Sequence, residues 1–121
     1  MLFRSLPTTA YINLANPVVV PALSAAPTNF KVSVVKANGN NYTATLSWAE
    51  AANPANFTIQ RANNLDFTTG LTSFTAASTA RGLTQTVTKN TVYYYRIRAN
   101  NSLGGSSAWT NASPFPIRTG P

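Results

Sequence analysis

Apolar and polar side chains alternate with a period of two along most of the chain after residue 26. In the clearest run, residues 93–100, Tyr93, Tyr95 and Ile97 share one face of the chain. Such alternation is typical of a β-strand with one buried face, and helical spacing is almost absent. The seven strands that the pattern predicts cover residues 30–35, 42–48, 57–61, 71–75, 83–88, 93–100 and 108–119.

Turn-forming residues separate these runs. Asn38-Gly39 follows the first run, Asn53-Pro54 precedes the third, and Gly104-Gly105 follows the sixth. Gly tolerates the positive φ of a tight hairpin, and short strands at regular intervals suit antiparallel pairing. Because each strand has one apolar face that must pack on another sheet, the sequence predicts an all-β fold, a seven-stranded antiparallel β-sandwich.

Three segments resemble the motifs of fibronectin type III domains. Leu46-Ser47-Trp48 is similar to the second-strand motif that places a Trp in the core. Residues 87–93, VTKNTVY, follow the family pattern Leu-x-Pro-Gly-Thr-x-Tyr, with Val, Lys and Asn in place of Leu, Pro and Gly. Residues 93–99, followed by Asn101 and Gly104, resemble the sixth strand and its outgoing loop. The resemblance covers residues 26–121.

The resemblance implies an immunoglobulin-like sandwich in which the Tyr93 hydroxyl bonds to backbone near the preceding loop, as a tyrosine corner. The departures from the pattern at Lys89 and Asn90 are expected to loosen that loop and to leave the strands intact. The residues predicted to form the core between the sheets are Leu46, Trp48, Phe57, Ile59, Tyr93, Tyr95 and Ile97.

The composition removes much catalytic chemistry. The 121 residues include no His and no Cys, so the chain has no imidazole base, thiol nucleophile, disulfide or His/Cys zinc site. Glu50 and Asp66 are the only carboxylates. They could form an acid–base pair for glycoside cleavage, but no other catalytic group supports them, and two solvated loop acids are the favoured interpretation. We therefore expect a protein that is not an enzyme and that has no cofactor and no metal.

A basic and aromatic group is the main candidate for a binding surface. Tyr94, Arg96 and Arg98 share the outward face of one predicted strand, and Trp109 lies on the strand expected beside it. The group could bind an anionic polymer, a surface polysaccharide or nucleic acid. Alternatively, the guanidinium groups stack on the rings for structural reasons, which is the favoured interpretation. Residues 106–110 resemble half of the Trp-Ser-x-Trp-Ser element of cytokine receptor domains, where such a ladder occurs.

The surface is poor in charge and rich in amides and hydroxyls. Charged residues make up 9% of the chain, against 14 Asn and 17 Thr, and the formal net charge is +7. This balance favours an exported or cell-surface protein over a cytosolic enzyme. Asn-x-Ser/Thr sequons occur at Asn41, Asn56, Asn100 and Asn111, close to the number expected by chance, so they do not indicate glycosylation. No apolar run is long enough to predict insertion in a membrane.

Residues 1–25 lie outside the resemblance and are expected to form an extended N-terminal tail or linker. They are too apolar for a solvated linker. The tail could pack on its own sandwich, could end a preceding domain, or could add as a strand to the sheet edge of another subunit and so build a filament. The residues of this candidate assembly strand are Ile12, Leu14, Val18, Val19 and Val20.

The sequence as a whole predicts a noncatalytic structural or protein-interaction module of an exported or surface-associated protein, acting in spacing or assembly. Its partners would be copies of itself or neighbouring domains of the same chain, with no specific nucleic acid. The alternative is a carbohydrate-binding accessory module of an extracellular enzyme, with an acidic polysaccharide as ligand and the Tyr94, Arg96, Arg98 and Trp109 group as its platform.

Overall fold

The structure is a computed structural model that describes residues 25–50 and 52–121. The strand predicted around Ile12 to Val20 lies outside the described residues. No helix long and apolar enough to cross a membrane occurs in the described part of the chain. Its strands are β1 (Thr28–Asn38), β2 (Asn41–Ala49), β3 (Asn56–Ala62), β4 (Thr72–Ala77), β5 (Gly82–Thr88), β6 (Val92–Asn100), β7 (Thr110–Asn111) and β8 (Ile117–Arg118).

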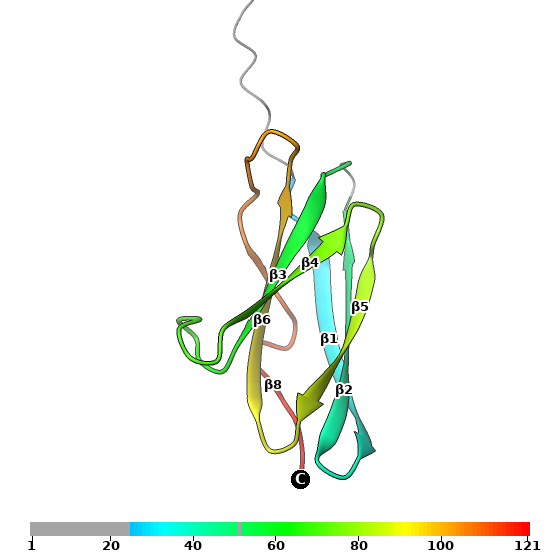
Figure 1. The fold of residues 1–121 in the computed structure, drawn as a ribbon, viewed down its shortest axis with the longest axis vertical. Helices are drawn as coiled ribbons and strands as arrows, with labels where there is room; N and C mark the ends of the chain where they lie inside the picture. The colour runs from blue at the N-terminus through cyan, green and yellow to red at the C-terminus, as the bar shows by residue number, and fades with distance from the viewer. Residues whose placement is uncertain (1–24, 51) are drawn as a thin grey trace, which may run out of the picture.

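The strands form two antiparallel sheets that pack face to face (Figure 1). One sheet has the order β1-β2-β5, and the other has the order β4-β3-β6-β7, with β8 also paired to β6. Gly39, in the turn between β1 and β2, has a φ of 43°, which glycine adopts without steric cost. The predicted all-β sandwich is confirmed.

The last predicted strand, residues 108–119, is interrupted. Only its two ends pair with β6, as β7 and β8, because Pro114 and Pro116 between them have no N–H to donate to a ladder. Ser113 turns instead toward β1, where its N–H donates to the Phe30 oxygen at 2.9 Å and its oxygen accepts from the Val32 N–H at 3.1 Å. The end of the chain therefore joins the two sheets along one side.

The seven residues predicted to form the core are all buried. Trp48 belongs to this core, with its ring edge-on to Phe57 at 5.4 Å and to Phe30 at 6.1 Å between centroids. The alternation seen in the sequence continues in the structure, because every second residue of β6 is buried. The two inner faces thus meet as one apolar layer.

Tyr93 fixes the connection between β5 and β6. Its hydroxyl accepts a hydrogen bond from the Thr88 N–H at 2.8 Å, which is the contact that the resemblance implies. Asn90 has a φ of 52°, in the left-handed region that Asn tolerates better than most residues, so it serves where the family pattern has Gly. The Lys89 N–H donates to the Asn40 oxygen at 2.9 Å and the Asn90 N–H to the Gly120 oxygen at 2.8 Å. The loop is therefore tied at several points, contrary to the expectation that it is loosened.

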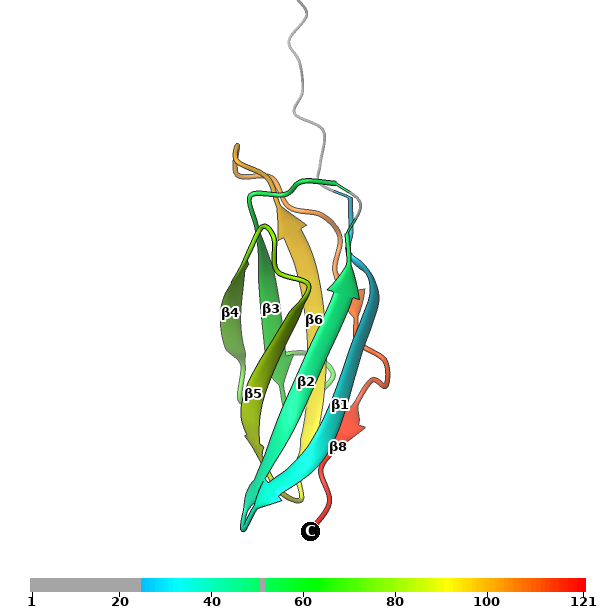
Figure 2. The ribbon, with the colours of Figure 1, turned by 90° about the vertical axis from the view of Figure 1, so that its right-hand side faces the viewer.

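The two ends of the domain lie at opposite poles of an elongated sandwich (Figures 1 and 2). Thr28, at the start of β1, pairs with Ala49 at one pole. Pro121 lies at the other pole, where its oxygen accepts from the Lys36 ammonium at 2.7 Å and from the Tyr42 hydroxyl at 3.2 Å. A chain that runs through the domain enters at one end and leaves at the other.

Candidate functional site

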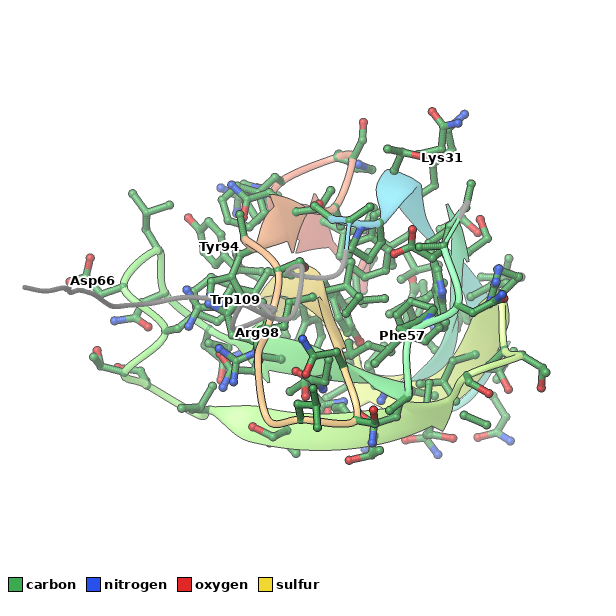
Figure 3. The ribbon with its side chains drawn as sticks, turned by 90° about the horizontal axis from the view of Figure 1, so that it is seen from above. Lys31, Phe57, Asp66, Tyr94, Arg98 and Trp109 are labelled. Carbon is green, nitrogen blue, oxygen red and sulfur yellow. The ribbon has the colours of Figure 1, made fainter. Side chains whose placement is uncertain are left out.

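The basic and aromatic residues predicted to share a surface are brought together on the outward face of β6. The guanidinium carbon of Arg96 lies 4.3 Å from the centroid of the Trp109 ring, and that of Arg98 lies 4.5 Å from the same ring. Figure 3 shows Tyr94, Arg98 and Trp109 grouped on one side of the sheet, with Phe57 on the interior side. Trp109 is held by both cations of one strand.

Two phenylalanines that sequence reasoning missed extend this stack. Phe67 lies 4.1 Å from the Arg96 guanidinium carbon, measured to its ring centroid. Phe115 stacks on Phe67 at 6.2 Å and meets Tyr94 edge-on at 5.0 Å. We call these six residues the ladder. Its members are Phe67, Tyr94, Arg96, Arg98, Trp109 and Phe115.

Gln60 on β3 sets the orientation of Arg96. Its side-chain oxygen accepts from Arg96 Nε at 2.9 Å and from Nη2 at 2.6 Å. Burial lowers the pKa of the Arg96 guanidinium, and the positive charge of Arg98 lowers it further. Arg96 nevertheless keeps its charge, because arginine does not deprotonate in proteins. The ladder is therefore a fixed, positively charged strip.

Two guanidinium groups already contact the Trp109 ring, so a sugar stacked on this ring would share it with them. The Nε of Arg98 is buried without a hydrogen-bond partner, whereas the Nε of Arg96 donates to Gln60. The geometry favours the structural interpretation of the ladder.

A second cation lies between aromatic rings on the interior side, at the edge where β4 and β5 face each other. The Arg61 guanidinium carbon lies 5.4 Å from the centroids of both Phe74 and Tyr93, and its Nη1 donates to Gln85 Oε1 at 3.4 Å. The Tyr95 hydroxyl donates to the same Gln85 oxygen at 2.9 Å. Burial is the main cause that raises the pKa of the Tyr95 hydroxyl above its ordinary value.

The two carboxylates do not form a catalytic pair. Glu50 precedes β3, and its Oε1 accepts from the Ala52 N–H at 3.2 Å. Asp66 is exposed in the loop that follows β3, so the two acids flank opposite ends of that strand. Among residues 25–50 and 52–121 there is no cavity and no group of three or more His, Cys, Asp or Glu that could hold a metal ion. The described domain offers surfaces rather than a pocket.

The sequons lie in two environments. Asn41 and Asn111 are exposed. Asn100 is half-buried, and its Nδ2 donates to Asn56 Oδ1 and to Thr58 Oγ1, both at 2.7 Å. The amides of Asn56 and Asn100 therefore join β3 to β6 as part of the sheet surface.

Comparison with known proteins identifies the fold. No family model and no curated protein matches the chain. Among solved structures, a Fn3-like protein from Clostridium thermocellum is 26% identical, with a TM-score of 0.55, over 76% of this chain and 94% of the other. The fn3 domain of the human collagen alpha-1(XX) chain is 14% identical, with a TM-score of 0.59, over 82% and 88%. The described domain is fibronectin type III-like.

A redesigned β-sandwich protein is similar at 24% identity and a TM-score of 0.64, over 81% of this chain and 92% of the other. The similar solved structures with a fibronectin type III fold are typically noncatalytic domains, and domains of this type generally mediate contacts between proteins. The fold is thus consistent with a noncatalytic interaction module. Because a fold hosts many functions, anything more specific must come from the surfaces of this chain.

Proposed function

We propose that this fibronectin type III-like domain is a noncatalytic structural and protein-interaction module of an exported or surface-associated protein, where it spaces or presents the segments on either side of it. The observation that carries the proposal is the position of its two ends at opposite poles. A domain of this geometry adds its full length to the separation of its neighbours. The charge-poor, Asn- and Thr-rich composition supports an exported location.

The pairing of β1 with the final segment of the chain suits a spacer that resists tension. Ser113, in the final segment, exchanges hydrogen bonds with Phe30 and Val32 of β1, and the bridge between Lys31 and Ser113 is parallel. A pull on the two ends draws β1 and this segment in opposite directions along their length. These hydrogen bonds are then loaded together rather than one after another.

Single-molecule force measurements on the full chain, held by its two ends, test this proposal. The variant S113P removes the N–H that donates to Phe30, whereas S113A keeps it. We expect S113P to unfold at a lower force than the parent chain and S113A to unfold at the same force. Equal forces for S113P and S113A would contradict a mechanical role for this pairing.

The carbohydrate-binding alternative has weaker support, because the cations of β6 already contact the ring of Trp109. A panel of immobilised neutral and acidic polysaccharides separates the two functions. The spacer proposal expects no retention at physiological salt, where the nonspecific attraction of a chain with a net charge of +7 is screened. Retention that W109A abolishes would favour the binding module instead. Assembly into filaments through the N-terminal tail stays a prediction.

A further inference from the structure

The free edge of β4 lacks the charges, prolines and bulges that usually prevent an edge strand from pairing further. Its six residues, TSFTAA, are uncharged and pair with β3 in an unbroken register, and no described strand pairs with its other side. β1, in contrast, carries Lys31 and Lys36, and Pro114 and Pro116 separate β7 from β8. β5 is also uncharged, but Figure 2 shows β4 at the lateral border of the domain, beyond β5, so an approaching strand meets β4 first.

The backbone groups on the free side of β4 follow from the pairing of the sheet. The Ala112 N–H donates to the Tyr95 oxygen, so odd-numbered residues of β6 direct their backbone groups toward β7. Even-numbered residues of β6 then bond to β3, and odd-numbered residues of β3 bond to the even-numbered residues of β4. The N–H and C=O groups of Ser73 and Thr75 therefore point to the free side.

Apolar side chains lie beside these free backbone groups. Phe74 packs against the core on the inward face but is only half-buried, and the Arg61 guanidinium carbon lies 5.4 Å from the centroid of its ring. Leu71, which immediately precedes β4, is 47% exposed. Ser73 and Thr75 are exposed on the outward face. A strand added beside β4 would cover the open part of Phe74.

We infer that β4 pairs with β4 of a second copy of this chain, as two antiparallel strands related by a two-fold axis. Charge favours this partner and this place of contact. The chain has a net charge of +7, so two copies repel each other least where they meet at an uncharged surface. Residues 67–80, which include β4, carry no charge. A two-fold axis also lets the same strand supply both the donors and the acceptors that its copy needs.

The register follows from the free groups and from Phe74. In an antiparallel pair, two residues that exchange N–H···O bonds lie opposite each other, so Ser73 of each copy lies opposite Thr75 of the other. This register places the two Phe74 side chains opposite each other on the inward face. They form a pair without backbone hydrogen bonds, in which side chains approach most closely. Aromatic pairs across strands stabilise a sheet.

The neighbouring registers use the free groups less well. A register centred on Thr75 places Ser73 opposite Ala77. The Ala77 oxygen already accepts from the Ala80 N–H at 2.9 Å. A register centred on Ser73 places Thr75 opposite Leu71, which lies outside β4. The register centred on residue 74 is therefore favoured.

Pairing through β4 leaves both ends of each domain free, because β4 lies on the flank between the two poles (Figure 1). The two copies lie side by side with their poles in opposite order. One strand pair is a small interface, so we expect a weak dimer that forms with rising protein concentration. The inference goes beyond the spacer role and does not depend on it.

Two single-cysteine variants test the register, because the chain has no native Cys. In this dimer, residues 73 and 75 of different copies lie about 5.5 Å apart between Cα atoms, which suits a disulfide. Identical residues lie diagonally, about 7–8 Å apart, which is too far. Under mild oxidation, we expect a mixture of S73C and T75C to form the mixed disulfide well above its statistical proportion. Each variant alone should stay mostly reduced. A statistical mixture, or self-pairing of either variant, would overturn the inference.

Proline at residue 75 gives a second measurement on the full chain. T75P removes an N–H on the free side and leaves the pairing of β4 with β3 intact, whereas T75A keeps the N–H. In sedimentation at rising protein concentration, we expect the parent chain and T75A to dimerise and T75P to stay monomeric, with circular dichroism confirming its fold. Dimerisation should strengthen with salt, which screens the repulsion between the copies.

A parent chain that stays monomeric, or a folded T75P that dimerises as T75A does, would contradict pairing through β4. None of these results bears on the mechanical role proposed for the Ser113 pairing, which is measured separately.

Discussion

The hydroxyl of Tyr93 accepts a hydrogen bond from the backbone N–H of Thr88, five residues earlier, at 2.8 Å. This contact joins the end of β5 to the start of β6 and so connects the two sheets. Tyr94, the next residue, points to the outward face, where it meets Phe115 edge-on. Neighbouring tyrosines of one strand thus serve different purposes: Tyr93 fixes a sheet-to-sheet connection, and Tyr94 belongs to the ladder.

Replacing Tyr93 by Phe removes this hydrogen bond and leaves the Thr88 N–H without its partner. We expect Y93F to lower the free energy of unfolding by about 1–2 kcal/mol. Urea denaturation followed by tryptophan fluorescence measures the change. Y94F, which also removes one hydroxyl, is the matched control and should change stability by less than about 0.5 kcal/mol. Equal effects of the two variants would refute the role assigned to Tyr93.

Replacing Trp109 by Ala removes the ring that both Arg96 and Arg98 contact. We expect a loss of about 2 kcal/mol, from two cation–π contacts and the packing of a half-buried side chain. Thermal and urea denaturation measure it. L103A removes a leucine that is 72% exposed and serves as a control with little expected effect. A W109A variant as stable as L103A would show that the ladder does not stabilise the fold.

The ionisation of Tyr95 makes the free energy of unfolding depend on pH in the alkaline range. Burial raises the pKa of its hydroxyl in the folded state, so the unfolded chain loses this proton at a lower pH than the folded chain does. The contribution of this hydroxyl to the free energy of unfolding is therefore fully present below the ordinary tyrosine pKa of about 10. It falls as the pH rises above that value. To isolate the contribution of this hydroxyl, the test compares urea midpoints of the parent chain and Y95F between about pH 8 and pH 11. The fall should be shallower for Y95F, and parallel curves would contradict the prediction.

Asn90 tests the backbone of the loop between β5 and β6. Its φ of 52° is accessible to Gly and Asn and costly for a β-branched residue. We expect N90V to lose about 1–2 kcal/mol of stability and N90G to stay within about 1 kcal/mol of the parent chain. Thermal denaturation of the two variants measures the difference. A stable N90V would mean that the loop relaxes to another conformation.

The sandwich could be predicted because burial of one face imposes a period of two on each strand. This pattern is local, and it extends from Phe30 to Ala99 with few exceptions. The same parity places Arg61 on the inward face with Phe57 and Ile59, so its interior position could have been recognised. Pro114 and Pro116 likewise signalled the break in the last strand, since neither can donate to a ladder.

The full extent of the ladder could not be predicted, because its contacts join residues far apart in the sequence. Phe67 lies in a polar loop with no periodic neighbours, yet it contacts Arg96 across the sheet. A lone phenylalanine in such a loop is the only local signal. Phe115 reaches Tyr94 because the chain stops pairing with β6 after Asn111. No hydrophobic periodicity in the sequence predicts the course of the chain from there to Phe115. Side chains brought together by turns need the fold before they can be assigned.

The direction of force tests the spacer proposal most directly. In the full chain, a pull between the two ends loads β1 against the Ser113 segment along their length. A pull between the N-terminal end and a cysteine placed at Ser102, in the turn after β6, acts at a single pole and peels β1 away one hydrogen bond at a time. We predict a clearly higher unfolding force for the first direction than for the second. Equal forces in the two directions would contradict a domain built to hold its neighbours apart under tension.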